Sequence, residues 1–345
     1  MEKAGAKGQR TEAGGKTHQI SLRLAEALVS RHCLKVLPHR CASPTADPSA
    51  VNCPNLHSNA LPTFGRGLTA GDRGELIIIS SVSRPVHHKM YELYIDFMSQ
   101  PSRALLILCR LNAKALRGQV EEKRTLIHKK EHKTEEYARL NPLGQIPCLV
   151  KRGETGKVSF ALPESCAILR HLCERFDLSD QWYPSYSPSS SDVANLLERQ
   201  AHVDSALHWY HSTLRAGCGG LTFHKVVAYN LGKKPVEAIA LDSKARLDRA
   251  LGQLETHWLR GKSFVGGDLP CVADLLFCCE IEQLNMLYFP TDGVDIESIL
   301  NGFPGVRAWM ARVAKQTGPV YEEVHKLLRY AARKRHERLS QRSRL

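Results

Sequence analysis

The sequence predicts a small α/β domain with a mixed sheet, followed by an all-helical bundle. Three observations support this prediction. Between 91 and 176, strand and helix patterns alternate in the order β-α-β-α-β-β-α. A stretch rich in proline and serine at 177–191 then has the composition of an interdomain linker. From 192 to 330, the pattern is almost wholly helical.

The α/β domain, which we place at 89–176, begins with a strand at Tyr91–Asp96. A helix follows at Pro101–Asn112, because a proline at the first helical position loses only an N–H that has no partner in the helix. Two later strands, at 145–150 and 157–162, are close enough along the chain to pair as a hairpin. The remaining elements are a strand near 118–121, a helix ending at 140 and a helix at 163–176.

The helical domain, at 192–330, begins at Asp192, which together with Ser191 can cap a long helix. We expect this helix to run to about Leu214. Further helical patterns lie at 235–258, 273–284, 303–315 and 319–336. The chain then ends in a basic tail at 331–345.

Residues 1–88 differ from the rest of the chain, because they are rich in Pro, Gly, Ser and Asn and show no sustained period. They predict a low-complexity leader that is either disordered or a targeting segment. Only Ile20–Leu37 could form an amphipathic basic helix, which is typical of organelle transit peptides. We favour an unstructured leader over organelle import by this segment.

The formal net charge of +13 lies in the two ends of the chain. Residues 1–86 contribute +5 and residues 326–345 contribute +7, whereas 87–325 are close to neutral. A basic tail binds polyanions without specificity. A polyanion-associated protein is therefore one alternative function, although the neutral body makes nucleic acid a weak partner.

The eleven cysteines include no C-x-x-C pair, which favours reduced thiols over a disulfide framework. Their spacing relative to histidines matches no zinc pattern, so we predict no metal site. Apolar runs stay well short of the ~20 residues that a membrane helix needs, so we expect a soluble protein with no membrane partner.

Three short motifs carry residues that could do chemistry. In "SQPSR", Ser99 and Gln100 are either turn residues or present a hydroxyl where a helix N-terminus attracts an anion. In "NPLGQIP", the Ile146–Pro147 bond is a candidate for the cis form, which would turn the backbone of Ile146 outward toward an extended peptide. In "PESCAIL", Ser165 after Glu164 is either an ordinary N-cap or part of a carboxylate site.

Taken together, these motifs resemble the theta class of glutathione transferases. "YELYIDFMSQPSRALL", "NPLGQIP", "ESCAIL" and "HWYHSTLR" stand in the order of that family, and the resemblance covers about 91–330. It implies a thioredoxin-like N-terminal domain followed by an all-helical substrate domain. It also implies a homodimer that uses glutathione as co-substrate, with no further cofactor, on electrophiles or organic hydroperoxides.

The resemblance also implies roles for individual residues. Two are catalytic: Ser99 donates a hydrogen bond to the glutathione sulfur, and Arg215 lies at the mouth of the site. The others bind glutathione. The backbone of Ile146 pairs with its cysteinyl unit, and the pair at 164–165 holds its γ-glutamyl end. The implied binding residues are Gln100, His132, Ile146, Pro147, Glu164 and Ser165.

Two features of the sequence depart from the family pattern. The leader has no counterpart there. In "PCVADLL", Cys271 takes the place of the usual serine or threonine before Asp274. Because cysteine caps poorly, we expect a weaker start to this helix.

The last three residues, Ser343–Leu345, belong to the S-K-L type of peroxisomal address with Arg344 in place of lysine. They predict a peroxisomal enzyme that binds an import receptor, with the cytoplasm as the alternative location. A second alternative function is a non-catalytic carrier or assembly module of the same fold. Such modules commonly lose the serine and the Glu-Ser pair that this chain retains.

Overall fold

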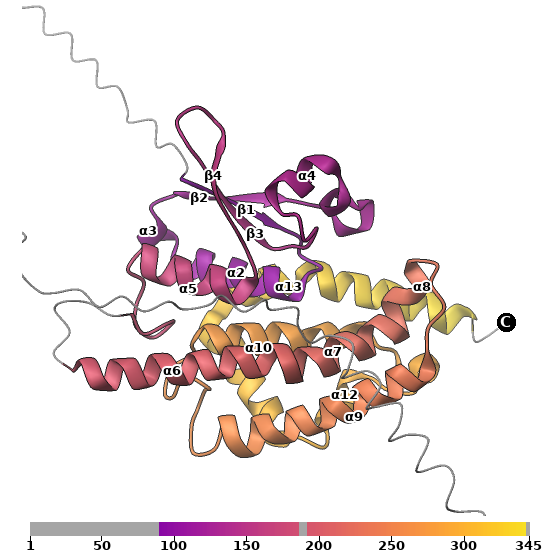
Figure 1. Cartoon of the computed structure of the whole chain (residues 1–345). Helices are drawn as coiled ribbons and strands as arrows, with labels where there is room; N and C mark the ends of the chain where they lie inside the picture. Colours follow the sequence, from indigo (N-terminus) through magenta and orange to yellow (C-terminus); the bar gives the residue numbers. More distant parts are fainter. Residues whose placement is uncertain (1–89, 186–191, 343–345) are drawn as a thin grey trace, which may run out of the picture. The chain divides into compact units, whose positions relative to one another are not determined.

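The computed structural model describes residues 90–185 and 192–342 (Figure 1). The chain divides into two units, Met1–Ile78 and Ile79–Leu345, and every described residue belongs to the second. The predicted leader at 1–88 and the C-terminal tripeptide at 343–345 lie outside the described residues, as does 186–191 of the predicted linker.

A mixed four-stranded sheet forms the first half of the described chain, with strand order β2-β1-β3-β4. The central strand β1 pairs parallel with β2 and antiparallel with β3, which forms a hairpin with β4. The predicted mixed sheet is therefore confirmed. The strands are β1 (Tyr91–Ile95), β2 (Val120–Arg124), β3 (Cys148–Arg152) and β4 (Val158–Pro163).

Helices lie on the sheet because alternate residues of each inner strand are apolar. On β1, Leu93 and Ile95 are fully buried, and they belong to the same core as α2 (Gln100–Leu111) and α5 (Ser165–Arg175). A smaller apolar cluster joins β3 to Tyr137 of α4 (Glu135–Leu140). The short elements between are α3 (Ala113–Leu116), η1 (Ile127–Lys129) and η2 (Glu131–Lys133).

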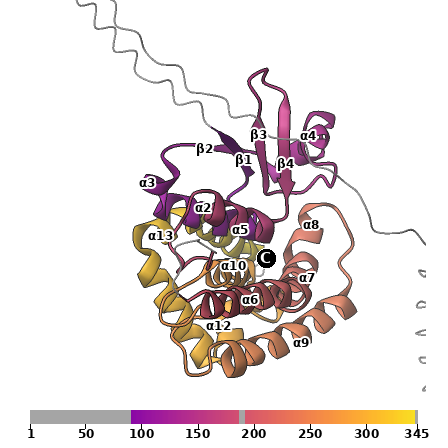
Figure 2. The same ribbon diagram turned by 60° about the vertical axis from the view of Figure 1, so that its left-hand side comes forward.

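The second half is helical, as predicted, and surrounds α10 (Val272–Glu282), which is buried along its whole length. Figure 2 shows α10 inside the bundle, with α2 and α5 between it and the sheet. The other elements are α9 (Glu237–Gln253), η5 (Leu254–Trp258), η6 (Gln283–Met286), α11 (Phe289–Asp292), α12 (Ile296–Leu300) and α13 (Pro304–Arg342). Within the described ranges, no helix has the length and apolarity required to cross a bilayer.

The first long helix of the bundle begins at Asp192, whose side chain caps it by accepting from the Asn195 N–H at 3.1 Å. It does not end near Leu214 as expected. Instead its backbone stays helical as far as Asn230, and it passes through two wider π turns. Its segments in chain order are α6 (Val193–Trp209), η3 (Tyr210–Leu214), α7 (Arg215–Thr222), η4 (Phe223–Val227) and α8 (Ala228–Asn230).

The start of α10 is well capped, so the expected weak start is wrong. Asp274 is fully buried and accepts from the Cys271 N–H at 2.9 Å, which is the capping-box contact. It also accepts from the Val265 N–H at 2.8 Å and from Trp309 Nε1 at 2.7 Å. The Cys271 side chain accepts in turn from the backbone N–H of Asp274, so the capping box is complete without a serine or threonine, and the Asp274 carboxylate also joins a loop to two helices.

The last helix, α13, changes direction at Gly318, whose φ of 55° is in the left-handed region that favours glycine. It continues through most of the predicted basic tail, to Arg342. Arg335 is nearly buried there and pairs with Asp292 at 2.7 Å. Part of the basic charge of the tail is thus neutralised inside the fold, which weakens the polyanion alternative.

We predict that Asp274→Asn lowers the free energy of unfolding by about 3 kcal/mol or more, because an amide nitrogen would face N–H groups that now donate to a buried carboxylate. Urea denaturation checks this value. Asp295→Asn is the matched control, since Asp295 caps α12 by accepting from the Ser298 N–H at 2.8 Å and asparagine caps equally well. A loss below about 1 kcal/mol in Asp274→Asn would contradict the prediction.

His325 makes the stability of the fold depend on pH. It is fully buried, and burial lowers its pKa from 6.5 to about 3, to which the nearby Arg103 also contributes. Below pH 6.5 the unfolded chain binds a proton that the folded chain does not, so stability falls as the pH drops toward 3.

Between pH 7 and pH 5, wild type should lose about 2 kcal/mol more unfolding free energy than His325→Gln, whose amide does not titrate. Urea denaturation of both proteins at the two pH values measures the difference. Equal losses in the two proteins would show that His325 takes up its proton within the fold.

Candidate active site

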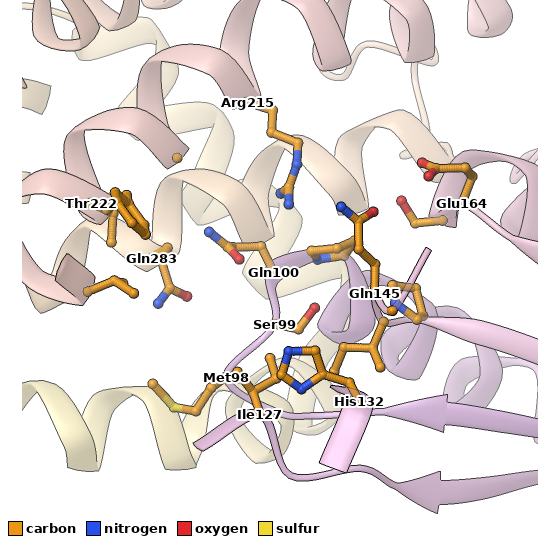
Figure 3. Close-up of a pocket in the computed structure, with 18 of the residues that line it drawn as sticks. Met98, Ser99, Gln100, Ile127, His132, Gln145, Glu164, Arg215, Thr222 and Gln283 are labelled. Atoms are coloured by element: carbon orange, nitrogen blue, oxygen red, sulfur yellow. The ribbon is translucent and has the colours of Figure 1, made fainter. Parts of the chain in front are cut away.

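A cavity of about 700 Å³ lies between the sheet domain and the helical domain. All eight residues that the sequence singles out for the site line it. Figure 3 shows the Arg215 side chain extending from its helix toward Gln100 and Ser99. The eight residues are Ser99, Gln100, His132, Ile146, Pro147, Glu164, Ser165 and Arg215.

Ser99 lies at the N-cap of α2, at the corner between β1 and that helix. Its Oγ accepts a hydrogen bond from the Ser102 N–H at 3.4 Å, which uses a lone pair and leaves the hydroxyl proton available for donation. The buried Asp96 holds the corner by accepting from the Met98 N–H at 2.8 Å and from the Ile127 N–H at 2.7 Å. The hydroxyl is therefore fixed beside the positive end of a helix dipole.

Glu280 of α10 organises the polar groups behind Ser99. It is fully buried and accepts from Arg215 Nη1 at 2.7 Å, from the Tyr210 hydroxyl at 2.8 Å and from Gln100 Nε2 at 3.3 Å. Burial by itself lowers the pKa of Arg215, but the carboxylate of Glu280 more than offsets this, so the net pKa is raised. Arg215 is thus a fixed cation.

Sequence reasoning missed Glu280. A signal was present, because Glu280 directly follows the apolar run "LLFCC", and a carboxylate in a buried helix needs partners. It also missed His211, whose Nε2 lies 3.9 Å from the Glu164 carboxylate at the rim of the same cavity.

The Ile146–Pro147 bond is cis, as expected for this motif. The loop before it is anchored through the Gln145 carbonyl, which accepts from Asn141 Nδ2 at 2.7 Å and from the Tyr137 hydroxyl at 2.8 Å. Ile146 is therefore held at the cavity wall by the contacts of its neighbours and by its own side chain, which packs against the apolar cluster that contains Tyr137.

His132 contributes a neutral imidazole to the cavity. Burial and then the charge of Lys133 lower its pKa, so the ring is uncharged near neutral pH. Its Nδ1 is buried and has no hydrogen-bond partner among the described residues. Lys133 itself donates to the Gly144 carbonyl at 2.6 Å, which joins η2 to the loop that precedes the cis bond.

Glu164 and Ser165 lie where β4 turns into α5. Glu164 has a φ of 72°, a region that costs a residue with a side chain about 1–3 kcal/mol and is commonly found at binding sites. Its side chain accepts no hydrogen bond from the helix that it precedes, so it is not an ordinary N-cap. The first N–H groups of α5 and the nearly buried Ser165 thus form a polar corner of the cavity.

The cysteines near the site are poor nucleophiles. Burial raises the pKa of both Cys109 and Cys166 to about 12, so neither is a thiolate near neutral pH. Cys109 is buried in α2, as the sequence predicts. No cysteine of residues 90–185 and 192–342 lines this cavity.

Comparison with known proteins agrees with the site and the fold. The family model described as glutathione S-transferase, N-terminal domain, matches residues 98–174, and the one described as glutathione S-transferase, C-terminal domain, matches residues 221–317. Glutathione S-transferase T1 of Arabidopsis thaliana is 33% identical over 69% of this chain and 88% of its own length. Glutathione S-transferase theta-1 of Bos taurus is also 33% identical, over 69% of this chain and 88% of its own length.

A solved structure shows the same relation. The human glutathione transferase theta-2, in complex with glutathione and an unknown ligand, has a TM-score of 0.59 at 27% identity. The match covers 72% of this chain and 91% of that one. The resemblance seen in the sequence is confirmed, and the chain belongs to the theta class of the glutathione S-transferase family.

Proposed function

We propose that the chain binds glutathione in this cavity and transfers its sulfur to electrophilic substrates, with Ser99 activating the thiol. One observation carries the proposal: eight residues from distant parts of the chain, each expected to bind or activate glutathione, line a single cavity. The names of the two relatives described above support the substrate, since both are glutathione S-transferases.

The activation step follows from electrostatics. A free thiol has a pKa of about 8.5, so little of it is thiolate at neutral pH. A hydrogen bond from the Ser99 hydroxyl, the N-terminus of α2 and the cation of Arg215 each favour the charged form. Lowering the thiol pKa by one or two units takes about 1.4 kcal/mol per unit, which these interactions can supply together. Ser99 keeps its proton, because its role is donation.

The remaining residues of the sheet domain would hold the peptide. Ser165 and the N–H groups that begin α5 suit the γ-glutamyl carboxylate, with Glu164 beside them for the amino group. The backbone of Ile146 would pair with the cysteinyl unit. His132 would donate its ring N–H to a carboxylate of the peptide, which a neutral imidazole can do.

The helical domain supplies the opposite wall, where the electrophile would bind. The lining there includes Phe223, Val226 and Val227 of η4 and Met286 of η6, and such an apolar surface accepts many carbon skeletons. The same thiolate could reduce organic hydroperoxides, which we propose as a second reaction of this site.

We also propose that the chain forms a homodimer and that Ser343–Leu345 directs it to peroxisomes. Light scattering of the purified chain tests the first proposal. Imaging of a tagged chain with and without this tripeptide tests the second.

We predict that Ser99→Ala raises the pKa of bound glutathione by about one unit or more and lowers kcat/KM at pH 6.5 about tenfold to a hundredfold, the effect of one hydrogen bond to a charged group. The ultraviolet absorbance of the thiolate, followed by pH titration, measures the pKa. Ser102→Ala is the matched control, because the Ser102 hydroxyl lies in the same turn of α2 and has no partner among the described residues. Glutathione that binds without a thiolate band in either wild type or variant would favour the carrier alternative.

We predict that His132→Asn weakens glutathione binding about tenfold, the effect of one hydrogen bond to a carboxylate, and leaves the thiol pKa unchanged. Isothermal titration calorimetry measures the affinity, and the thiolate absorbance measures the pKa. His128→Asn is the control, since His128 is an exposed histidine of the neighbouring η1 that does not line the cavity. An altered pKa with unaltered affinity would assign His132 to activation instead.

A further inference from the structure

The apolar wall of the cavity, against which the electrophile would lie, is built from two separate elements. Phe223, Val226 and Val227 belong to η4, and Met286 ends η6. We call these four residues the electrophile wall. Because dispersion contacts weaken steeply when a gap opens between two surfaces, the wall binds an apolar group well only if η4 and η6 keep a fixed separation.

Arg335, in the last turns of α13, contacts the backbone of both elements. Its Nη2 donates to the Lys225 carbonyl of η4 at 3.2 Å, and its Nη1 donates to the Met286 carbonyl of η6 at 2.9 Å. Figure 1 shows this end of α13 beside α8, which continues η4. Arg335 does not line the cavity itself, so it acts on the wall from behind rather than on a bound molecule.

The guanidinium is held in one orientation by Asp292, the last residue of α11. Its Nη1 donates to Oδ2 at 2.7 Å, and its Nη2 donates to Oδ1 at 2.9 Å. The side chains of Arg335 and Asp292 are only 9% and 3% exposed. The same carboxylate accepts from the Tyr288 N–H at 2.7 Å, which ties the pair to the start of α11. A bidentate pair of this kind fixes where the remaining donors of the guanidinium point.

The two backbone contacts go beyond what the ion pair needs. Met286 is the last residue of η6, where a carbonyl has no partner within its own helix. Lys225 stands between the wall residues Phe223 and Val226 in η4. One side chain therefore holds the two halves of the electrophile wall at the backbone, next to the residues that face the cavity.

We infer that Arg335 is a positioning residue for the electrophile, because it sets the separation of η4 and η6. This inference rests on the proposed function, which places the electrophile against their side chains. The glutathione side of the cavity is held by other contacts, such as the bond from Arg103 to the Phe97 carbonyl in the loop before Ser99. Loss of Arg335 therefore weakens the binding of an apolar group on the sulfur and leaves the binding of glutathione itself unchanged.

The test compares the affinities of the full chain for glutathione and for S-hexylglutathione, both measured by isothermal titration calorimetry. The hexyl chain extends from the sulfur toward the electrophile wall, so the ratio of the two dissociation constants reports on that wall alone. We expect wild type to bind S-hexylglutathione about tenfold or more tightly than glutathione, because alkyl surface is buried.

Two variants remove the guanidinium. Arg335→Met leaves the Asp292 carboxylate buried and unpaired, which destabilises the fold. The double variant Arg335→Met with Asp292→Asn removes both charges and avoids this cost. We expect each variant to reduce the advantage of the hexyl group about fourfold or more, equivalent to returning one methylene group to water. The KM for 4-nitrobenzyl chloride should rise in proportion, while kcat and the pKa of the bound thiol stay unchanged.

Arg307→Met is the matched control. Arg307 also lies on α13, and it joins this helix to α12 by donating to the Glu297 carboxylate at 2.6 Å and to the Glu297 carbonyl at 3.2 Å. Neither residue lines the cavity. This variant should keep the full advantage of the hexyl group, which separates the position of Arg335 from the general loss of an arginine contact on α13.

The outcomes distinguish this inference from the proposed function. A hexyl advantage that stays unchanged in both Arg335 variants would overturn the inference alone, whatever their stability. An equal loss of affinity for both compounds would also overturn it, since Arg335 would then support the whole cavity. A wild type that binds neither compound would overturn the proposed function and the inference together. The thiolate band, recorded in each variant, shows that its glutathione site is intact.

Discussion

The buried guanidinium of Arg103 is the contact on which the geometry of the site depends. It joins the loop before Ser99, the last turns of α10 and Gln283, with three hydrogen bonds of 2.8–2.9 Å. A buried cation is stable only when such acceptors surround it, and the acceptors in turn would be costly to leave unpaired. The two domains are thus locked together directly behind the cavity, where a small shift would separate the thiol from its activating groups.

Glu280 has the same role for the side chains that face the cavity. One carboxylate fixes a cation, a hydroxyl and an amide, so a single residue of α10 determines where three polar groups point. Arg103 and Glu280 both act across the domain boundary. The electrophile wall and the glutathione wall are therefore parts of one hydrogen-bonded assembly, rather than two surfaces that happen to meet.

The residues that could be predicted from the sequence are those whose geometry is local. A few neighbouring residues determine the conformation at each of these positions: Ser99 stands near Pro101, Ile146 precedes Pro147, and Ser165 begins a helix. Glu280 and Gln283 do not, because their hydrogen-bond partners lie 65 to 180 positions earlier in the chain. The expectation for Cys271 was wrong for the same reason, since Asp274 draws its support from Val265 and Trp309, which no local pattern connects.

The π turn at Tyr210–Leu214 has a geometric effect at the same place. Residues five apart lie about 140° apart around an ordinary α-helix, so they cannot both reach one point beside it. The wider turn reduces that angle, and the side chains of Tyr210 and Arg215, five positions apart, both contact the same oxygen of Glu280. Removing one residue from this turn would restore an ordinary helix and rotate one of the two away. Whether Tyr210 and Arg215 can both contact the Glu280 carboxylate therefore depends on the number of residues in the π turn as well as on their identity.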